Sequence, residues 1–533
     1  MVRRSQSLKL CLSLLLTFFC VSFVERLTAQ EIGGLHGLNN DPLILAESAE
    51  MKKLRMAVEV NISDLKAHEA YLSAFRKRKS PANAAADYKD LEAQYNYWIS
   101  RYPKNATIPF VLGEFYFRME RAEAQLYLLK TTEIKPDFAE AWFKLGIDAM
   151  RLGDDTLVLK YLETAMKADL LNGDYAFQYA YSATSVSRKL SDSLLLDVSK
   201  VFHDTEAGAR AITELAAREK DLKTKFTRLA GLNLFKKTGG IRYRNAMSVY
   251  FSLLINNGNY DTALSLAQRM NGGVVTNKLE WKHKVEVAEQ FQQLEAMINA
   301  KKYIEAERLL KLIKLNDDFS MSYVKASDKI AAIKETILMG TGRGESILDT
   351  LIVKYKKSPS FKLRNQINRY AAQFGKDSVE LYQAISASWL EKMKRATDFT
   401  LTSYSGEKVA LADLKGKVVL LTYWFPGCGP CRGEFPHFEN VLQKFDKDRI
   451  VYLGINAVAE QDPYVIPFMK STGFSFTPLK IDKDWDPGNL PAFGYPQNYL
   501  IDQQGMIIMS GFMINEDNED MLELKIKAVL SAK

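Results

Sequence analysis

Two cysteines, Cys428 and Cys431, have the residue type and spacing best suited to chemistry in this 533-residue chain. The chain contains four cysteines, and the other two, Cys11 and Cys20, lie in an apolar N-terminal stretch. A Cys-x-x-Cys pair either exchanges disulfides or supplies half of a zinc site. A zinc site needs two further soft ligands, and His437 is the only histidine near the pair in sequence. The spacing therefore favours dithiol–disulfide exchange, with no metal or other cofactor.

The flanking segments place this pair between a strand and a helix. Residues 417–424 form a short apolar run rich in β-branched and aromatic residues, typical of a buried strand. Residues 430–445 carry helical spacing. Cys428 is therefore expected at a helix N-terminus, where unpaired N–H groups and the helix dipole lower a thiol pKa from about 8.5 to roughly 3.5–7.5. We expect Cys428 to face solvent as the nucleophile and Cys431, one turn further in, to close the disulfide.

The surrounding sequence resembles the TlpA-like branch of the thioredoxin family, over about the last quarter of the chain. The segments that carry the resemblance are 397–401 with 406–417, 428–431, 434–436, and 495–502 with Gly505. Two positions depart from the family pattern. Gly427 stands before the first cysteine, where an aromatic residue is usual, and Tyr495 stands before a proline, where a smaller residue is common. Both are expected on the substrate face, so they bear on specificity.

The resemblance implies a thioredoxin-like α/β domain over residues 396–533 that exchanges disulfides with protein substrates. It also implies a cis bond before Pro496, next to the cysteines. The implied substrate-binding residues are Trp424, Gly427, Tyr495 and Pro496, with Trp424 packing under the active site. Strands are predicted at Val418–Trp424, 450–455, 498–501 and 506–512, and helices at 430–445, 464–472 and 517–530.

Thiol–disulfide exchange also requires a group that moves a proton. Thioredoxins carry a buried acid six residues before the first cysteine, but this position is Thr422 here. Glu434, one turn past Cys431, occupies the place where the TlpA-like branch carries an acid. We therefore expect Glu434 to be catalytic, the alternative being an ordinary exposed helix glutamate.

The N-terminus has the pattern of a secretory signal. Residues 1–29 combine a basic start, an apolar run over 10–24 and a polar stretch that ends at Ala29. We expect cleavage after Ala29 and a periplasmic protein. An uncleaved membrane anchor remains the alternative, because Leu27 is unfavourable at the third position before the cut.

Charge is unevenly divided along the chain. From Ala396 onward there are 13 Lys and Arg against 18 Asp and Glu, whereas the preceding part has 59 against 46. This asymmetry could favour docking of the two parts on each other or on an acidic partner. The alternative is that the charges simply cover solvated helix faces. No basic–aromatic motif for nucleic acid occurs.

Residues 49–395 show helical spacing almost throughout, with two segments that repeat at a spacing of 33 residues. Pro103, Phe110, Leu112 and Gly113 align with Pro136, Phe143, Leu145 and Gly146. This spacing is near the period of tetratricopeptide repeats. We therefore predict an N-terminal helical segment over 30–100 and a degenerate tetratricopeptide-like solenoid over 101–395, in which Gly146 lets paired helices approach across a turn at Gly153-Asp154. An irregular helical bundle is the alternative.

Three functions compete on this evidence. The first is a thiol–disulfide oxidoreductase whose helical part binds a protein partner and whose electrons come from an upstream membrane thiol donor. The second is a binding scaffold with an incidental redox tail. The third is a peroxiredoxin, which the residues before Cys428 disfavour, because Phe425, Pro426 and Gly427 do not make a peroxidatic motif.

Overall fold

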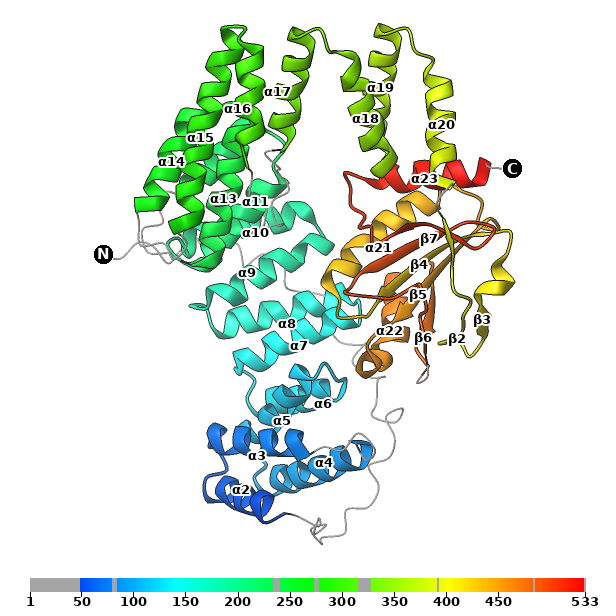
Figure 1. Ribbon diagram of the computed structural model, residues 1–533. Coiled ribbons are helices and arrows are strands. Elements are labelled where there is room, and N and C mark those ends of the chain that lie inside the picture. The colour runs from blue at the N-terminus through cyan, green and yellow to red at the C-terminus, as the bar shows by residue number, and fades with distance from the viewer. Residues whose placement is uncertain are drawn as a thin grey trace, which may run out of the picture.

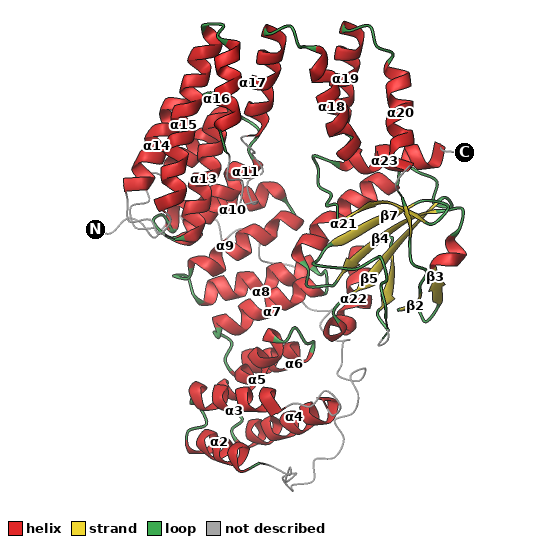
Figure 2. Ribbon diagram, viewed as in Figure 1, coloured by secondary structure: helices red, strands yellow, loops and turns green. Residues whose placement is uncertain are grey.

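The chain is helical first and α/β afterwards. The computed structural model describes residues 48–78, 84–232, 240–272, 278–314, 327–390, 393–482 and 485–531. The expected signal peptide lies outside these residues. Within them, helices alone run to Leu390 and strands begin at Lys394, which Figures 1 and 2 show as a curved helical region beside a separate sheet. We call residues 48–390 the helical region and residues 393–531 the α/β domain.

The helical region consists of consecutive helices joined mostly by short turns. They are α2 (Ala49–Val60), α3 (Leu65–Arg78), α4 (Ala84–Arg101), α5 (Thr107–Arg118), α6 (Glu123–Ile134), α7 (Ala139–Arg151), α8 (Asp155–Ala168), α9 (Gly173–Ser182), α10 (Arg188–Val201), α11 (Glu206–Arg218), α12 (Leu222–Gly231), α13 (Ile241–Asn256), α14 (Tyr260–Gly272), α15 (Lys278–Asn299), α16 (Tyr303–Leu312), α17 (Ser327–Gly340), α18 (Glu345–Lys357), α19 (Phe361–Gln373) and α20 (Ser378–Leu390). None of the helices in the described residues is long and apolar enough to cross a membrane.

Two successive helix pairs, α5–α6 and α7–α8, share one packing device. A Cβ atom on Gly113 would lie 3.0 Å from Leu128 Cγ, and a Cβ atom on Gly146 would lie 2.6 Å from Leu162 Cδ2. Because a glycine has no side chain, the second helix packs directly on the backbone of the first. The expected role of Gly146 is thus confirmed by its geometry, and Gly113 does the same in the preceding pair.

The turn between α7 and α8 forms where the sequence predicts it. Gly153 adopts a positive φ of 67°, a conformation that glycine reaches without strain. Asp154 then caps α8, its side chain accepting a hydrogen bond of 2.9 Å from the Leu157 N–H. The turn reverses the chain and carries the end of α7 toward the α/β domain.

The α/β domain contains one eight-stranded sheet in the order β1-β8-β7-β4-β5-β6-β2-β3. The strands are β1 (Lys394–Arg395), β2 (Thr400–Ser403), β3 (Lys408–Ala410), β4 (Val418–Trp424), β5 (Ile450–Asn456), β6 (Thr477–Lys480), β7 (Gln497–Ile501) and β8 (Met506–Ser510). The central β4 runs parallel to β5 and antiparallel to β7. The helices are α21 (Gly429–Leu442), α22 (Asp462–Thr472) and α23 (Glu519–Ser531).

Strand β4 is buried along its whole length because both faces of the sheet are covered. Val418, Leu420 and Trp424 pack with residues of α21, α22 and α23 in one apolar cluster. Val419, Leu421 and Tyr423 point the other way, into a second cluster with residues of β2 and the loops. This continuous apolar run is the expected signature of a strand covered on both faces. The predicted fold class, a helical N-terminal region followed by a thioredoxin-like domain, is confirmed.

The predicted elements of the α/β domain match the observed ones within a few residues. The last strand stops at Ser510 rather than at Phe512, because Gly511 takes a positive φ of 65° and bends the chain. The sheet also begins slightly before the expected boundary at 396, since Lys394 and Arg395 pair with β8.

The helical region contacts the α/β domain at two places, as Figure 1 shows. The turns of α5–α6 and α7–α8 lie against α22. Helices α18–α20 lie against α23, where Leu524 joins their apolar cluster and Lys525 Nζ lies 3.5 Å from the centre of the Trp389 ring. At the first contact the α/β domain contributes the uncharged Gln461 and Ser471 to these hydrogen bonds.

Candidate active site

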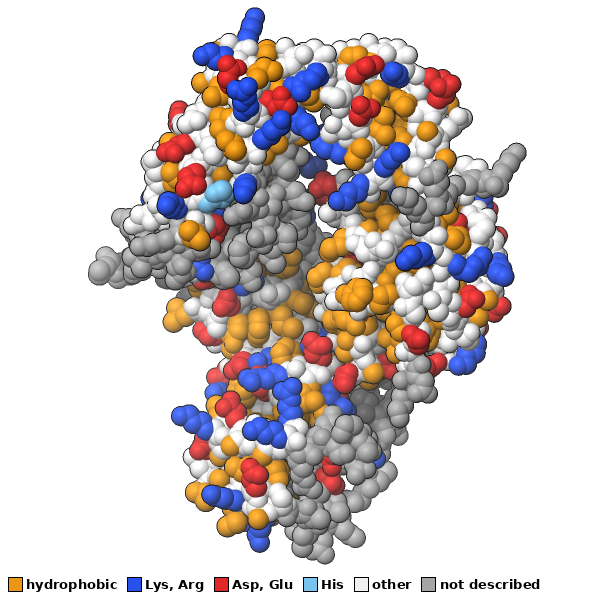
Figure 3. Space-filling model, in the orientation of Figure 1, with side chains coloured by type: hydrophobic (Ala, Val, Ile, Leu, Met, Phe, Trp, Pro, Cys, Tyr) orange, Lys and Arg blue, Asp and Glu red, His pale blue; other side chains and the backbone are white. Residues whose placement is uncertain are grey.

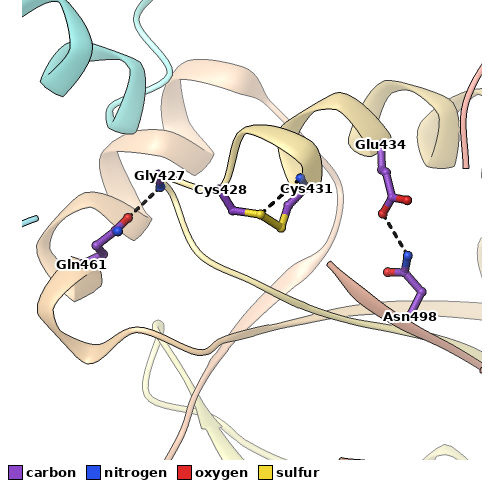
Figure 4. Close-up of a disulfide and its surroundings, with 6 residues drawn as sticks. All are labelled: Gly427, Cys428, Cys431, Glu434, Gln461 and Asn498. Atoms are coloured by element: carbon purple, nitrogen blue, oxygen red, sulfur yellow. Dashed lines mark hydrogen bonds between the residues drawn. A yellow bond between two sulfur atoms is a disulfide. The ribbon is translucent and has the colours of Figure 1, made fainter. Parts of the chain in front are cut away.

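The cysteine pair lies where strand β4 passes into helix α21 (Figure 4). Cys428 and Cys431 form a disulfide with a Cα–Cα distance of 5.3 Å. Cys428 is the N-cap of α21, and its Sγ accepts a hydrogen bond of 3.2 Å from the Cys431 N–H. Pro430 lies in the first turn, where its missing N–H costs nothing. The sulfur of Cys428 therefore sits where the helix N-terminus stabilises negative charge.

Cys428 is more deeply placed than the sequence suggests. Cys431 is fully buried, as expected, but Cys428 is only 3% exposed. The prediction that Cys428 faces solvent is therefore wrong. Its side chain belongs to the apolar cluster around Trp424 and Phe435. Gln461 and Arg151 lie beside the preceding Gly427, which itself is exposed.

Gly427, the departure from the family pattern, is held by a direct hydrogen bond. Its N–H donates to Gln461 Oε1 at 2.6 Å, as Figure 4 shows. A Cβ atom at this position would lie 3.0 Å from the Gln461 amide group and 3.3 Å from Arg151 Nε. An aromatic side chain cannot be accommodated here unless Gln461 and Arg151 move away.

Glu434 is buried beside the pair, with an exposed fraction of 2%. Its carboxylate accepts a hydrogen bond of 2.8 Å from Asn498 Nδ2 (Figure 4) and another of 2.8 Å from the Ile514 N–H. Burial raises the pKa of Glu434, and these two hydrogen bonds oppose the rise without cancelling it. The alternative of an exposed helix glutamate is therefore wrong.

Asn498, which sequence reasoning missed, connects Glu434 to the sheet. Its Nδ2 also donates to the Phe512 carbonyl at 2.8 Å, and its backbone pairs with Thr422 on β4. Thr422 is fully buried, and its hydroxyl has no hydrogen-bond partner among the described residues. Asn498 is a polar residue within the strand predicted at 498–501, and this was the sequence signal that could have identified it as part of the site.

Trp424, expected among the substrate-binding residues, is fully buried and cannot touch a substrate. Its ring packs against Phe435, Phe468 and Phe476, with centroid distances of 5.4, 5.1 and 4.9 Å. It supports the active site from below, as the resemblance implied, because β4 is covered on both faces.

The other predicted substrate-binding residues lie at the surface. The Tyr495–Pro496 bond is cis, as expected. Tyr495 is 41% exposed and packs edge-on against Phe425, while Phe493, which the sequence analysis did not single out, is 90% exposed. Figure 3 shows hydrophobic side chains gathered on the part of the α/β domain that faces the helical region.

His437 is engaged away from the cysteines. Its Nδ1 lies 2.7 Å from Glu519 Oε1 on α23. Across the residues that the structure describes, no group of three or more His, Cys, Asp or Glu side chains is arranged to hold a metal ion.

Comparison with known proteins decides the family. The sequence model of the AhpC/TSA family matches residues 393–510. The thioredoxin-like protein YneN of Bacillus subtilis is 34% identical over 149 residues, which cover 27% of this chain and 87% of that protein. The thiol-disulfide oxidoreductase ResA of Bacillus anthracis is 33% identical over 153 residues, covering 28% of this chain and 86% of that protein. The chain belongs to the thioredoxin-like thiol–disulfide oxidoreductases.

The likeness of this oxidoreductase to its relatives covers about a quarter of its length. Among solved structures, a thiol:disulfide interchange protein of the thioredoxin family from Chlorobium tepidum is 24% identical, with a TM-score of 0.23, over 26% of this chain and 98% of that one. The curated relatives above indicate a redox enzyme, and this chain carries a large helical region outside the part that matches them.

Proposed function

We propose that this enzyme exchanges disulfides with protein substrates outside the cytoplasm through Cys428 and Cys431. The thiolate of Cys428 attacks a substrate disulfide, forms a mixed disulfide and releases one substrate thiolate. The thiolate of Cys431 then attacks Cys428 Sγ, closes the Cys428–Cys431 disulfide and releases the second substrate thiol. The substrate gains two electrons and the enzyme loses two. The same steps in reverse oxidise a substrate dithiol.

One observation carries this proposal: Cys428 caps helix α21 and is bonded to Cys431 one turn further along. The capping position favours a thiolate on Cys428, while Cys431 is fully buried. These observations support attack by Cys428 and resolution by Cys431.

Trapping tests this division of roles. In the full-length protein, Cys431→Ser leaves an attacking thiolate without a resolving thiol, so mixed disulfides with natural partners accumulate and disappear on reduction. Cys428→Ser traps little. Non-reducing gels compare the two variants, and mass spectrometry of the bands names the substrates. Equal trapping by both variants contradicts the assigned roles.

Glu434 is proposed to move the proton that this exchange requires. Its carboxyl group lies one turn past Cys431, is buried, and has a raised pKa. A carboxyl that keeps its proton to higher pH serves as a better acid near neutrality. Tyr495, Pro496 and the backbone at Gly427 are proposed to receive the substrate segment, and electrons are proposed to come from an upstream membrane thiol donor.

The helical region is proposed to be tetratricopeptide-like and to bind a protein partner. The equivalent Gly–Leu contacts of α5–α6 and α7–α8 support a repeat. A cavity of about 420 Å³ between α9, α11, α12 and α13, lined by Phe177, Tyr181, Arg210, Leu229 and Leu253 among others, is a candidate site for a partner side chain.

Export is proposed from the signal pattern of residues 1–29. N-terminal sequencing of protein isolated from the cell envelope should begin at Gln30. A chain that still begins at Met1 and fractionates with membranes favours the uncleaved anchor instead.

A further inference from the structure

A chain of hydrogen bonds connects the helical region to the residue before Cys428. The Gly427 N–H donates to Gln461 Oε1, and Gln461 Nε2 donates to Glu120 Oε2, both at 2.6 Å. Glu120 lies in the turn between α5 and α6, and Gln461 is fully buried. A side chain far away in sequence therefore holds the backbone next to the cysteine pair.

A second polar group fills the space beside this chain. Arg151, the last residue of α7, lies over Gly427 and is bonded to Asp148 Oδ1 at 2.7 Å. Asp148 Oδ1 in turn accepts a hydrogen bond of 2.7 Å from the Tyr464 hydroxyl of α22. Asp148 is 1% and Arg151 7% exposed, so both are almost fully enclosed by the contact.

The backbone of the α7–α8 turn packs directly against α22, with no room for a side chain at Gly153. A Cβ atom on Gly153 would lie 2.7 Å from Thr472 Cγ2 and 3.1 Å from Phe468 Cδ2. Ser471 Oγ donates a hydrogen bond of 2.9 Å to the Gly153 carbonyl. Phe468 also packs on Trp424 beneath the cysteines. The turn therefore contacts a residue that supports the active site from below.

Buried polar groups are costly unless they find partners. Here Gln461 and Asp148 find partners across the boundary between the helical region and the α/β domain, and Arg151 pairs with Asp148 within the helical region. A non-specific apolar collapse does not produce two such buried polar contacts. The contact is therefore a built part of the folded enzyme, and Gly427 is the residue that leaves room for it.

We propose that Glu120, Asp148, Arg151 and Gly153 form a helical wall of the active site, and that this wall decides which disulfides reach Cys428. The inference rests on the proposed role of Cys428 as the attacking thiol. The wall stands beside the exposed Gly427 backbone and does not include the exposed Tyr495 and Phe493. A small disulfide, or one in a narrow extended segment, can therefore reach Cys428 past the wall. A disulfide on a broad folded surface collides with the wall, so Glu120 and Arg151 are positioning residues that set specificity.

Single-turnover kinetics test this inference with the full-length protein. The reduced enzyme, freed of reductant, is mixed with oxidised glutathione or with native insulin, and acid-quenched samples are assayed for remaining enzyme thiols. The quantity compared is the ratio of the insulin rate to the glutathione disulfide rate. Glu120→Arg breaks the bond to Gln461 and repels Arg151, whose Nη2 lies 3.8 Å from Glu120 Oε1.

In Glu120→Arg, the ratio of the insulin rate to the glutathione disulfide rate should rise about tenfold. This is the change expected when the wall loses one or two hydrogen bonds. Glu120→Gln keeps an acceptor for Gln461 and should restore most of the wild-type ratio. Ser471→Trp, which inserts bulk from the α22 side, should raise the ratio as well and covers the case in which Glu120→Arg fails to fold. Glu133→Arg, on the exposed face of α6, is the matched control and should keep the wild-type ratio.

An unchanged ratio in both Glu120→Arg and Ser471→Trp overturns the inference, as does an equal loss of both rates, which indicates a merely structural contact. A wild-type enzyme that reacts with neither probe overturns the proposed function instead. The two failures are thus distinguishable.

Discussion

At the scale of single residues, the site depends on how burial changes ordinary side chains. The sequence leaves open whether Glu434 is a catalytic acid or an ordinary exposed helix glutamate, and in the fold Asn498 and Ile514 hold it in a buried position. Burial disfavours the charged carboxylate and raises its pKa. This raised pKa supports the proposed role of Glu434 as the group that moves the proton.

Replacing Glu434 by glutamine should remove this proton exchange. Because glutamine does not titrate, Glu434→Gln should slow release of the mixed disulfide by about a hundredfold, as is typical when an acid–base group is lost. The pH–rate profile should also lose the limb that Glu434 causes. Stopped-flow thiol release measured against pH checks this. Glu439→Gln on the same helix is the control, and an unchanged profile in Glu434→Gln returns Glu434 to a structural role.

At the scale of elements, close helix packing places the α7–α8 turn at the active site. The contact between Gly146 and Leu162 determines how near these two helices lie. Helix propensity alone favours alanine over glycine by about 1 kcal/mol. The steric conflict acts in the opposite direction, since overpacking a well-filled core costs about 1–3 kcal/mol.

We therefore expect Gly146→Ala to lower the free energy of unfolding by about 1 kcal/mol, the overpacking cost exceeding the gain in helix propensity. Gly433→Ala in α21 is the matched control, because nothing lies within 4 Å of a Cβ atom there. It should leave stability unchanged or raise it slightly. Urea unfolding of both variants decides the matter, and a stabilised Gly146→Ala means that Leu162 moves aside easily.

The contact between α23 and α20 contains a lysine in an unusual setting. Lys525 is 4% exposed, and its ammonium group lies over the Trp389 ring. Burial lowers the pKa of Lys525 to about 7. Above that pH the folded chain holds this lysine neutral, while the unfolded chain still binds the proton up to about pH 10.4. Stability therefore rises with pH between these two values, because the unfolded state binds more protons there.

Lys525→Met should remove this rise of the free energy of unfolding with pH. The methionine side chain fills similar space without a charge, so the variant should be more stable than the wild type near neutral pH. The difference should shrink as the pH approaches 10. Urea unfolding at several pH values measures it, with the exposed Lys527→Met as control. A slope that persists in Lys525→Met contradicts the assignment.

At the scale of the whole molecule, the α/β domain has two apolar cores of its own and contributes to a third core in the helical region. The two clusters around β4 contain residues of that domain alone. Leu524 instead packs among residues of α18–α20. We therefore expect the α/β domain to be a folding unit that the helical region stabilises further.

A fragment of residues 395–533 should accordingly fold by itself, with thioredoxin-like circular dichroism. It should unfold at lower urea concentration than the same domain in the full chain, because Leu524 and Tyr464 lose their partners. Thiol reactivity followed during urea unfolding compares the two. A fragment without secondary structure means that the boundary is wrong or that the cores are shared more widely.

Local patterns in the sequence determined much of this protein. The Cys-x-x-Cys spacing, the apolar run of β4, the helix after it and the Gly153-Asp154 turn follow from neighbouring residues, whereas the cis bond before Pro496 was implied by the family resemblance. Backbone preference and hydrophobic periodicity act over a few positions, so each of these features is visible in a short window of sequence.

Only the tertiary structure decided what covers the cysteines. The burial of Cys428 and Glu434, and the placing of Glu120 against Gln461, depend on residues that are far apart along the chain, and such pairs leave no local pattern. Gly427 was the one local sign, an absent side chain where an aromatic is usual. The reason for a glycine at this position is visible only in the fold, because Gln461 and Arg151 occupy the space that a larger side chain would need.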